Sequence, residues 1–272
     1  MPRRRAVDNR RAGKRTLDFN RGAAISFRHP MKQRTARAVK ILIAAAAVIA
    51  AALIIVSKVR GPEARNVLSN PGFEQGDKGW QWLSWSKGWA PFAISGKRPR
   101  TGTSAALLAV RSQDDARSTI VWGVVQELTL PIPMPDCLEG YYYVDGWTRG
   151  ARNQYIQAVI IDLSQKYSNG NAQMRYIISG VDTQPYNLGN AHYVFADPGK
   201  PTTPPAGTWI RFSLDPAGDF EREWKYLPAA GHRLRVLFEA RFDNHGPGDA
   251  EAKADVYYDD LYLGPAARGH CR

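Results

Sequence analysis

The pattern of apolar and polar positions divides the chain into one unbroken apolar run and a long region of short alternating segments. Residues 41–57, with the sequence ILIAAAAVIAAALIIVS, contain no charge, proline or glycine. From Asn66 onward, short apolar stretches alternate with polar positions and are separated by Gly, Pro, Asn and Asp, which is typical of strands joined by turns. The expected strands cover residues 104–110, 119–130, 141–149, 155–163, 208–214, 234–242 and 255–263. Seven or more short strands without a helical period between them predict an all-β antiparallel sandwich.

The apolar run predicts one transmembrane helix. At a rise of about 1.5 Å per residue, a helix over residues 41–57 is at the short end of what spans a bilayer, and the flanking Lys40 and Lys58 extend it toward the headgroups. A buried core helix would have a polar face, whereas this run is apolar all round. The alternative is a cleaved signal peptide, but the sequence that follows, SKVRG, lacks a small-x-small cleavage site. We therefore expect an uncleaved signal anchor.

The positive charge of the chain is concentrated before this run. Residues 1–40 hold 13 Lys and Arg against two acids, Asp8 and Asp18, while residues 41–272 hold 24 against 23. Basic flanks stay on the cytoplasmic side of a membrane, so we expect the amino terminus in the cytoplasm and residues 58–272 outside it. The tail lacks apolar periodicity and is expected to be disordered, with attraction to the lipid bilayer. Nucleic acid is not an expected partner, because no folded segment accompanies the charge.

These features predict five consecutive parts. They are a basic cytoplasmic tail (1–40), a transmembrane helix (41–57), a linker (58–65), a sandwich (66–264) with an insertion at 164–206, and a C-terminal tail (265–272). The two cysteines, Cys137 and Cys271, are too few for a disulfide-dense scaffold or an all-cysteine zinc site. Both are expected in an oxidising compartment, but the sequence does not fix the distance between their Cα atoms, so their pairing stays open.

Several motifs of the sandwich region resemble one family of proteins. In chain order they are NVLSNPGFEQGDKGW (66–80), TGTSAALL (101–108), VVQELTL (124–130), YVDGWTRG (143–150), GTWIRFSL (207–214) and VYYDDLYL (256–263). This order is similar to that of carbohydrate-binding modules of the family-four, family-nine and family-twenty-two kinds, which are galactose-binding-like jelly rolls. The resemblance covers residues 66–263, interrupted by 164–206, and implies a jelly-roll sandwich. It says much less about the ligand, because this fold serves many partners.

The opening and closing motifs each carry a carboxylate that suggests a cation site. Alternation in YYDDLYL forces Asp259 or Asp260 inward, and a buried carboxylate needs a partner. The resemblance implies a structural calcium held by Glu74, by carbonyls of the loop at 97–103, and by Asp259. Carboxylates with carbonyls are suitable ligands for calcium. The alternative is a metal-free pair of carboxylates that accept hydrogen bonds from backbone amides.

Aromatic residues supply candidates for sugar stacking. The segment GWQWLSWSKGWAPF holds four of the eight tryptophans, Trp80, Trp82, Trp85 and Trp89. Sugar rings bind on flat aromatic faces flanked by polar groups. Trp80 matches a core position of the family pattern, so we take Trp82 and Trp85 as the candidate ligand contacts.

A second set of candidates follows from alternation in YYYVDGWTRG. Asp145, Trp147 and Arg149 share one face, and the two charged residues predict that this face points outward. With Tyr155 and Gln157 on a neighbouring strand, it would form an aromatic and polar sugar-binding groove. Equally, the insertion at 164–206 folds over this face and packs on Trp147.

No catalytic motif is present in the sequence. The five histidines stand alone, GxSxG and HExxH do not occur, and the adjacent acids, such as Asp114 with Asp115, are typical of solvated surface. We therefore expect a non-enzymatic protein of the cell membrane that binds a polysaccharide or envelope glycan at the cell surface. The alternative is a protein-interaction module, such as an accessory subunit of a membrane or envelope complex.

Overall fold

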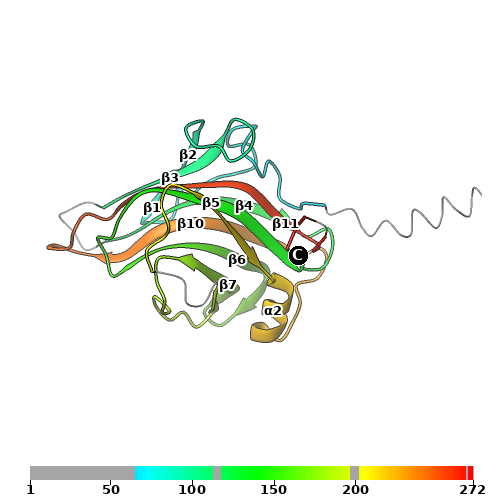
Figure 1. The fold of residues 1–272 in the computed structure, drawn as a ribbon. Coiled ribbons are helices and arrows are strands. Elements are labelled where there is room, and N and C mark those ends of the chain that lie inside the picture. The colour runs from blue at the N-terminus through cyan, green and yellow to red at the C-terminus, as the bar shows by residue number, and fades with distance from the viewer. Residues whose placement is uncertain (1–64, 113–117, 197–201, 268, 272) are drawn as a thin grey trace, which may run out of the picture. The chain divides into compact units, whose positions relative to one another are not determined.

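The computed structural model describes residues 65–112, 118–196, 202–267 and 269–271, shown in Figure 1. Residues 62–272 form one compact unit. The basic tail, the predicted transmembrane helix at 41–57 and most of the predicted linker lie outside the described residues. Within the described ranges, no helix has the length and apolar character needed to cross a bilayer.

The domain is a sandwich of two β-sheets, as the alternating pattern predicts. A six-stranded sheet has the order β1-β4-β10-β6-β7-β8, and a five-stranded sheet has the order β2-β3-β11-β5-β9. The last two strands, β10 and β11, each lie between earlier strands, β10 between β4 and β6 and β11 between β3 and β5. The strands are β1 (Trp89–Ala90), β2 (Ala93–Ser95), β3 (Ala105–Arg111), β4 (Ser118–Thr129), β5 (Cys137–Thr148), β6 (Asn153–Tyr167), β7 (Gly170–Ser179), β8 (Ala191–Phe195), β9 (Trp209–Leu214), β10 (Arg233–His245) and β11 (Lys253–Gly264).

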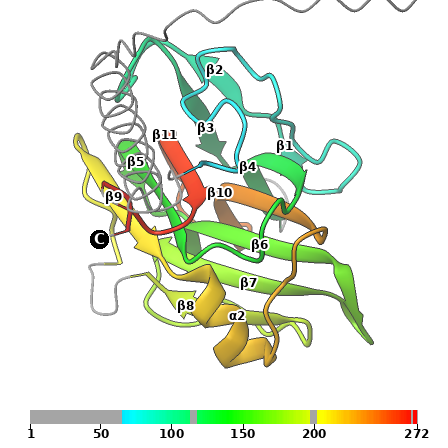
Figure 2. The same cartoon turned by 90° about the vertical axis from the view of Figure 1, so that its right-hand side faces the viewer.

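Two features go beyond the predicted strands. Residues 164–206, an insertion by sequence, contain β7 and β8, which extend the six-stranded sheet. A short helix, α2 (Pro216–Trp224), follows β9 and lies beside β7 (Figure 2). Its start is encoded locally, because the Asp215 side chain accepts a hydrogen bond from the amide of Gly218 and Pro216 takes the first helical position.

The core lies between the two sheets and is rich in aromatic side chains. Phe238 of β10 contacts Trp80, Phe212 and Tyr258, which come from the opening loop, β9 and β11. The hydroxyl of buried Tyr258 donates to the carbonyl of Glu239 at 3.1 Å, so burying this phenol leaves no unpaired donor. The alternation of β10 thus places one side of the strand inside the sandwich and leaves Arg235, Glu239 and Arg241 on the outer face.

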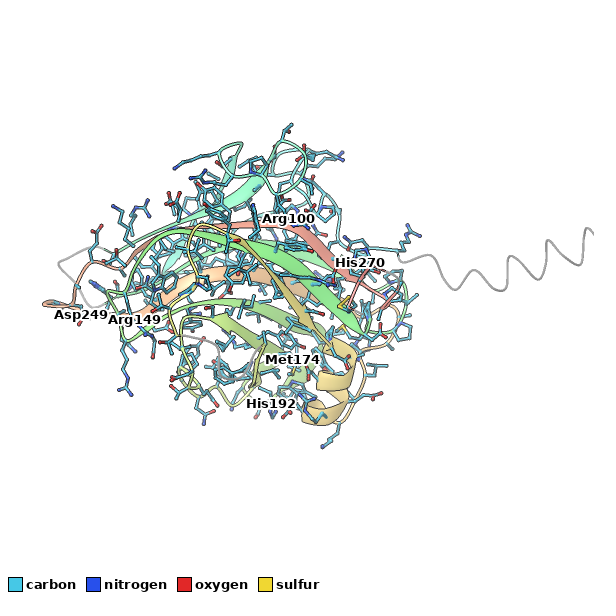
Figure 3. All side chains as sticks on the ribbon, viewed as in Figure 1. Arg100, Arg149, Met174, His192, Asp249 and His270 are labelled. Atoms are coloured by element: carbon cyan, nitrogen blue, oxygen red, sulfur yellow. A yellow bond between two sulfur atoms is a disulfide. The ribbon has the colours of Figure 1, made fainter. Side chains whose placement is uncertain are left out.

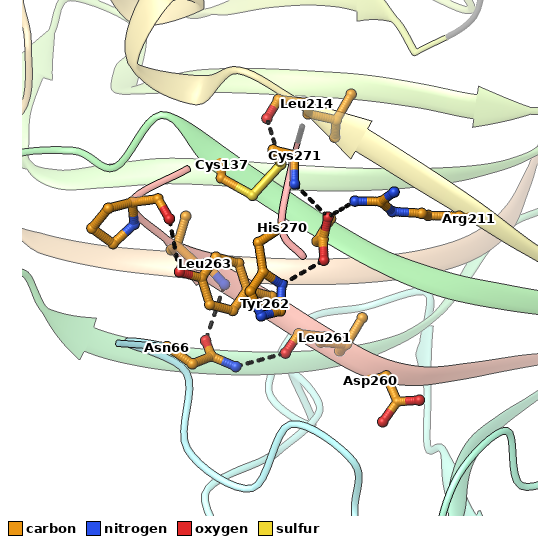
Figure 4. Close-up of polar contacts among 12 residues, drawn as sticks. Asn66, Cys137, Arg211, Leu214, Asp260, Leu261, Tyr262, Leu263, His270 and Cys271 are labelled. Carbon is orange, nitrogen blue, oxygen red and sulfur yellow. Dashed lines mark hydrogen bonds and ion pairs between the residues drawn. A yellow bond between two sulfur atoms is a disulfide. The ribbon is translucent and has the colours of Figure 1, made fainter. Parts of the chain in front are cut away.

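A disulfide closes the end of the sandwich where the described chain starts and finishes (Figure 4). Cys137 and Cys271 are bonded, with their Cα atoms 5.6 Å apart. Buried Glu139 accepts hydrogen bonds from Arg211, from His270 Nδ1 at 2.6 Å and from the amide of Cys271 at 2.9 Å. Burial opposes ionisation of Glu139, but these donors outweigh it and lower the pKa of the carboxyl.

The start of the domain is held at this same end. The side-chain amide of Asn66 donates to the carbonyl of Leu261 at 2.7 Å, and its oxygen accepts from the amide of Leu263 at 3.0 Å. We call this the clasped end, defined by Asn66, Cys137, Glu139, His270 and Cys271. Every charged group named at the clasped end has a partner.

Candidate functional site

The outer face of the six-stranded sheet is covered where the sequence predicted an open groove. Tyr155 and Gln157 are both fully buried, and the Gln157 amide donates to Glu239 at 2.5 Å. Tyr155 packs in a cluster with residues of β7, β8 and the segment between them, namely Ile177, Val181, Tyr186, Tyr193 and Phe195. The expectation of an open groove is wrong at these positions. The alternative, in which residues 164–206 fold over this face, is confirmed at Tyr155, because β7 and β8 widen the sheet and their side chains, with those of the segment between them, pack against Tyr155.

A buried arginine holds the covering segment in place. Arg241 of β10 is ion-paired with Asp243, and its guanidinium lies 5.5 Å from the ring centroid of Tyr155 and 5.4 Å from that of Tyr186. The Tyr155 hydroxyl donates to Asp243 at 2.8 Å. Burial disfavours the charged form of Arg241, but Tyr155, Asp243 and Glu239 raise its pKa above the ordinary value, so the guanidinium stays ionised. This network joins Arg241 and Asp243 of β10 to Tyr155 of β6 and to Tyr186 of the segment between β7 and β8.

Trp147 does not point outward, because the strand contains a bulge. Opposite one residue of β11, strand β5 places two residues, Gly146 and Trp147, and Gly146 has a φ of +66°. The extra residue reverses the alternation, so that Trp147 packs half-buried against the main core. The expectation that Trp147 shares an exposed face with Asp145 and Arg149 is therefore wrong. A glycine within an alternating strand was the available sign of a bulge.

Asp145 and Arg149 consequently contact different parts of the domain. The Asp145 carboxylate is partly exposed, 3.4 Å from Arg98 and 4.0 Å from Lys97. The Arg149 guanidinium donates instead to the carbonyls of Gly180, at 2.6 Å, and Arg152, at 3.1 Å. The structure does not bring these two predicted ligand contacts together.

The tryptophan-rich segment has one strongly exposed ring. Trp80 is buried, and its indole N–H donates to the carbonyl of Asn70 at 2.9 Å, which confirms it as a core residue. Trp82 is half-buried, whereas Trp85 is 73% exposed. The Arg235 guanidinium lies 5.7 Å from the Trp85 ring centroid and pairs with Glu127 at 2.6 Å. Contact of Trp85 with a ligand stays a prediction, and its exposure permits it.

The carboxylates of the opening and closing motifs both hold the loop at 97–104. Glu74 accepts from the amides of Thr103 and Ser104, each at 2.9 Å, and from the Thr103 hydroxyl at 2.8 Å. Fully buried Asp259 accepts from the amides of residues 100 and 101 on one oxygen and from the following amide on the other. The amide of Thr103 is the main reason why the pKa of Glu74 is lowered, whereas burial raises the pKa of Asp259 to about 6.

This arrangement does not fit a calcium site. All four carboxylate oxygens of Glu74 and Asp259 accept hydrogen bonds, and the loop turns its N–H groups toward them. A calcium ion requires six to eight converging oxygen ligands, and its charge repels N–H donors. The geometry is that of the metal-free alternative, and calcium stays a prediction of the family resemblance.

The end of the sandwich opposite the clasped end contains two hollows with shared walls. Figure 3 shows Arg149 and Asp249 at this end and His270 at the other. The hollows have volumes of about 620 and 470 Å³ and share Arg152, Asn153 and Thr183. We call them the distal hollows. The larger is also lined by Gln184, Pro185, Asp243, Asn244 and Asp249, and the smaller by Arg149, Val181, Asp182 and Thr202.

Turns between strands build the distal hollows and fix part of their lining. The Asn153 amide donates to the carbonyl of Pro185 at 3.1 Å, which joins the start of β6 to the segment after β7. The Asp249 carboxylate accepts from the amide of Gly246 at 2.8 Å. Asn244 has a φ of +56°, a conformation that asparagine tolerates better than most residues. Amide, carboxylate, guanidinium and hydroxyl groups therefore face one space, a set that can donate to and accept from a polyhydroxylated ligand.

Of the residues that line the distal hollows, only Arg149 was a candidate from the sequence. The signal that could have found the others lies in the turn segments RGARN (149–153), GVDTQP (180–185) and DNHGPGD (243–249), which are rich in Asn, Asp and Gly. Strands β7 and β10 flank β6 and both run antiparallel to it, so the ends of β7 and β10 lie beside the start of β6, and the turns at these three points meet. Their gathering follows from strand order, which the sequence alone did not give.

Comparisons with known proteins identify similar structures but no sequence family. No family model matches the chain, and no curated protein matches it. A xylan-binding family 22 carbohydrate-binding module from Paenibacillus barcinonensis is 16% identical, with a TM-score of 0.38, over 76% of this chain and 99% of that one. A putative sugar-binding protein from Bacteroides thetaiotaomicron is 11% identical, with a TM-score of 0.40, over 74% of this chain and all of that one.

Other similar structures are larger proteins. An enzymatically active domain of a bacteriophage CBA120 tailspike is 13% identical, with a TM-score of 0.39, and the match covers 73% of this chain but 21% of that one. Because every one of these TM-scores is below 0.5, the likeness carries no functional argument, and the sandwich is established by its own strand order. The solved structures to which this chain is similar include carbohydrate-binding modules of the β-sandwich kind, the class that its sequence motifs resemble.

Proposed function

We propose that the chain is a membrane-anchored, extracytoplasmic, non-catalytic protein that binds a polysaccharide or envelope glycan at the distal hollows. The observation that carries the proposal is the lining of these hollows by planar polar side chains from three turn segments. Asn153 and Gln184 offer amides, Arg152 a guanidinium, and Thr183 a hydroxyl. Such groups form paired hydrogen bonds with neighbouring hydroxyls of a sugar, and the volumes are within the range of ligand sites.

Binding without catalysis is supported by the state of the buried carboxylate in the hollows. Asp243 accepts from Arg241 on one oxygen and from the Tyr155 hydroxyl on the other. A general acid or base needs a carboxyl group that is free to exchange a proton with the substrate. Asp243 instead accepts hydrogen bonds from Arg241 and Tyr155, which hold the covering segment on the outer face.

Anchoring at the membrane is supported by the apolar run at 41–57 and by the basic residues before it. The chain enters the sandwich at Asn66, which is bonded to Leu261 and Leu263 at the clasped end. The distal hollows are therefore at the end far from this entry point (Figure 3).

The alternative function, a protein-interaction module, is favoured by one observation. Trp85 projects from a covered outer face and is 73% exposed, beside the Arg235–Glu127 pair. Exposed tryptophan and arginine side chains are frequent anchors of protein interfaces. An accessory subunit of a membrane or envelope complex would use this surface instead of the distal hollows.

A glycan array probed with the purified full-length chain tests the proposal, followed by titrations with the polymer that binds best. Asn153→Ala and Gln184→Ala are expected to weaken binding, because each removes a side-chain amide from the hollows. Lys166→Ala is the matched control, since Lys166 is exposed near the far end of β6. Loss of binding in Trp85→Ala, with the hollow variants unaffected, would favour the surface around Trp85.

A further inference from the structure

The two arginines of the smaller distal hollow carry charge that the described residues do not neutralise. Arg149 and Arg152 both line this hollow. The Arg149 guanidinium donates to backbone carbonyls of Gly180 and Arg152, which fix its orientation but leave its charge. Within the described ranges, the exposed Arg152 guanidinium has no hydrogen-bond or ion-pair partner. Two like charges that face one space repel each other, and an anion between them removes the repulsion.

The carboxylates near these arginines do not supply that anion. Asp182 lines the same hollow and is exposed, but no ion pair joins it to either arginine in the described part of the chain. Asp243 is ion-paired with Arg241, whereas Asp249 lines only the larger hollow, where it accepts from the amide of Gly246 and keeps its negative charge. The arginine side of the distal hollows is thus left open to a charged group from outside.

We infer, building on the proposed function, that the bound glycan is acidic and carries a carboxylate, as in a hexuronate. Its carboxylate would contact Arg152 and Arg149, while its hydroxyls contact Asn153 and Thr183. The planar guanidinium matches a carboxylate with two parallel hydrogen bonds, which a neutral sugar cannot accept in the same way. A phosphate group on a glycan offers related chemistry, and the experiment below separates the two sources.

The test is isothermal titration calorimetry of the full-length chain with three polymers: polygalacturonate, its carboxyl-reduced form, and a poly(glycerol phosphate). Polygalacturonate is expected to bind the wild type about tenfold or more tightly than the carboxyl-reduced form, since hydrogen bonds to charged groups contribute on that order. Arg152→Ala should remove this preference. Arg152→Lys should keep part of the preference, because lysine retains the positive charge but not the planar guanidinium. Lys166→Ala should leave it unchanged.

Three outcomes would overturn the inference. Equal binding of polygalacturonate and its carboxyl-reduced form would mean that the hollow takes a neutral glycan, and the proposed function would still stand. Preference for poly(glycerol phosphate) would assign the arginines to phosphate instead of carboxylate. If no glycan of the array binds at all, the proposed function itself fails, and the inference fails with it.

Discussion

At the clasped end of the sandwich Glu139 is buried and accepts hydrogen bonds from Arg211, His270 and the amide of Cys271. At the opposite end, the exposed guanidinium of Arg152 has no hydrogen-bond or ion-pair partner among the described residues. At the clasped end the polar groups bond to one another, and a disulfide adds a covalent link. At the distal end, polar groups without partners in the domain are available to bind a ligand. We therefore expect substitutions at the clasped end to lower the stability of the domain, and substitutions at the distal end to weaken ligand binding.

The largest effect is expected from opening the clasp. Cys137→Ser with Cys271→Ser removes a cross-link between residues 134 positions apart, which is expected to lower the free energy of unfolding by about 3 to 5 kcal/mol. Denaturant unfolding of the purified chain measures this change. A loss below about 1 kcal/mol would show that the hydrogen bonds of Glu139 hold this end without the disulfide.

Trp147→Ala tests the bulge in β5. Because Trp147 packs half-buried against the main core, we expect a loss of about 2 to 4 kcal/mol, near the range for truncating core aromatics. Thermal unfolding monitored by circular dichroism gives the value. An exposed tryptophan would cost less than about 0.5 kcal/mol, so a loss that small would return Trp147 to the outer face.

The pH dependence of stability tests the burial of Asp259. Its pKa is raised to about 6 in the folded protein, above the value of about 3.9 for an unfolded Asp, so the folded state binds the proton more tightly. The stability of the wild type relative to Asp259→Asn should therefore fall as the pH rises from about 4 to about 6, by at most 2 to 3 kcal/mol. Thermal melts across this range decide it, and a relative stability that does not change would contradict the raised pKa.

Removal of the Glu74 carboxylate tests the metal-free arrangement. Glu74→Ala leaves the amides of Thr103 and Ser104 without their acceptor and is expected to lower the melting temperature. A chelator should leave the melting temperature of the wild type unchanged, because the carboxylate oxygens are already occupied by donors. A chelator-dependent decrease that is absent in Glu74→Ala would establish the calcium site instead.

The smallest effect on stability is expected at the distal end. Arg152→Ala removes an exposed side chain without a partner and should change the free energy of unfolding by less than about 0.5 kcal/mol. Chemical denaturation measures it beside the glycan titrations. A larger loss would mean that Arg152 supports the fold, and its effect on binding would then be indirect.

Much of the fold follows from the sequence because alternation reports which residues face the core. Each of the seven predicted strands overlaps a strand of the structure, and Trp80 lies in the core, as the opening motif suggests. Alternation fails at Trp147, where one extra residue reverses the faces. A periodic signal cannot locate a bulge, since its only local mark is Gly146.

The candidate site was harder to predict for a different reason. Tyr155 and Gln157 have the pattern of an outward face, and they do point away from the core, but both are buried. Side chains of β7, of β8 and of the segment between these strands pack against Tyr155. Whether an outward face is exposed depends on distant segments. The distal hollows, likewise, form where three turns from separate parts of the chain meet, so no single segment of the sequence predicts them.

The most direct test of the separation between the two ends is hydrogen exchange of the full-length chain with and without the best-binding glycan. We expect protection of residues 149–153, 180–185 and 243–249, and no change at residues 137–139 or 262–271. Protection confined to residues 81–89, around Trp85, would place the binding surface there, and protection at the clasped end would contradict the assignment of recognition to the distal hollows.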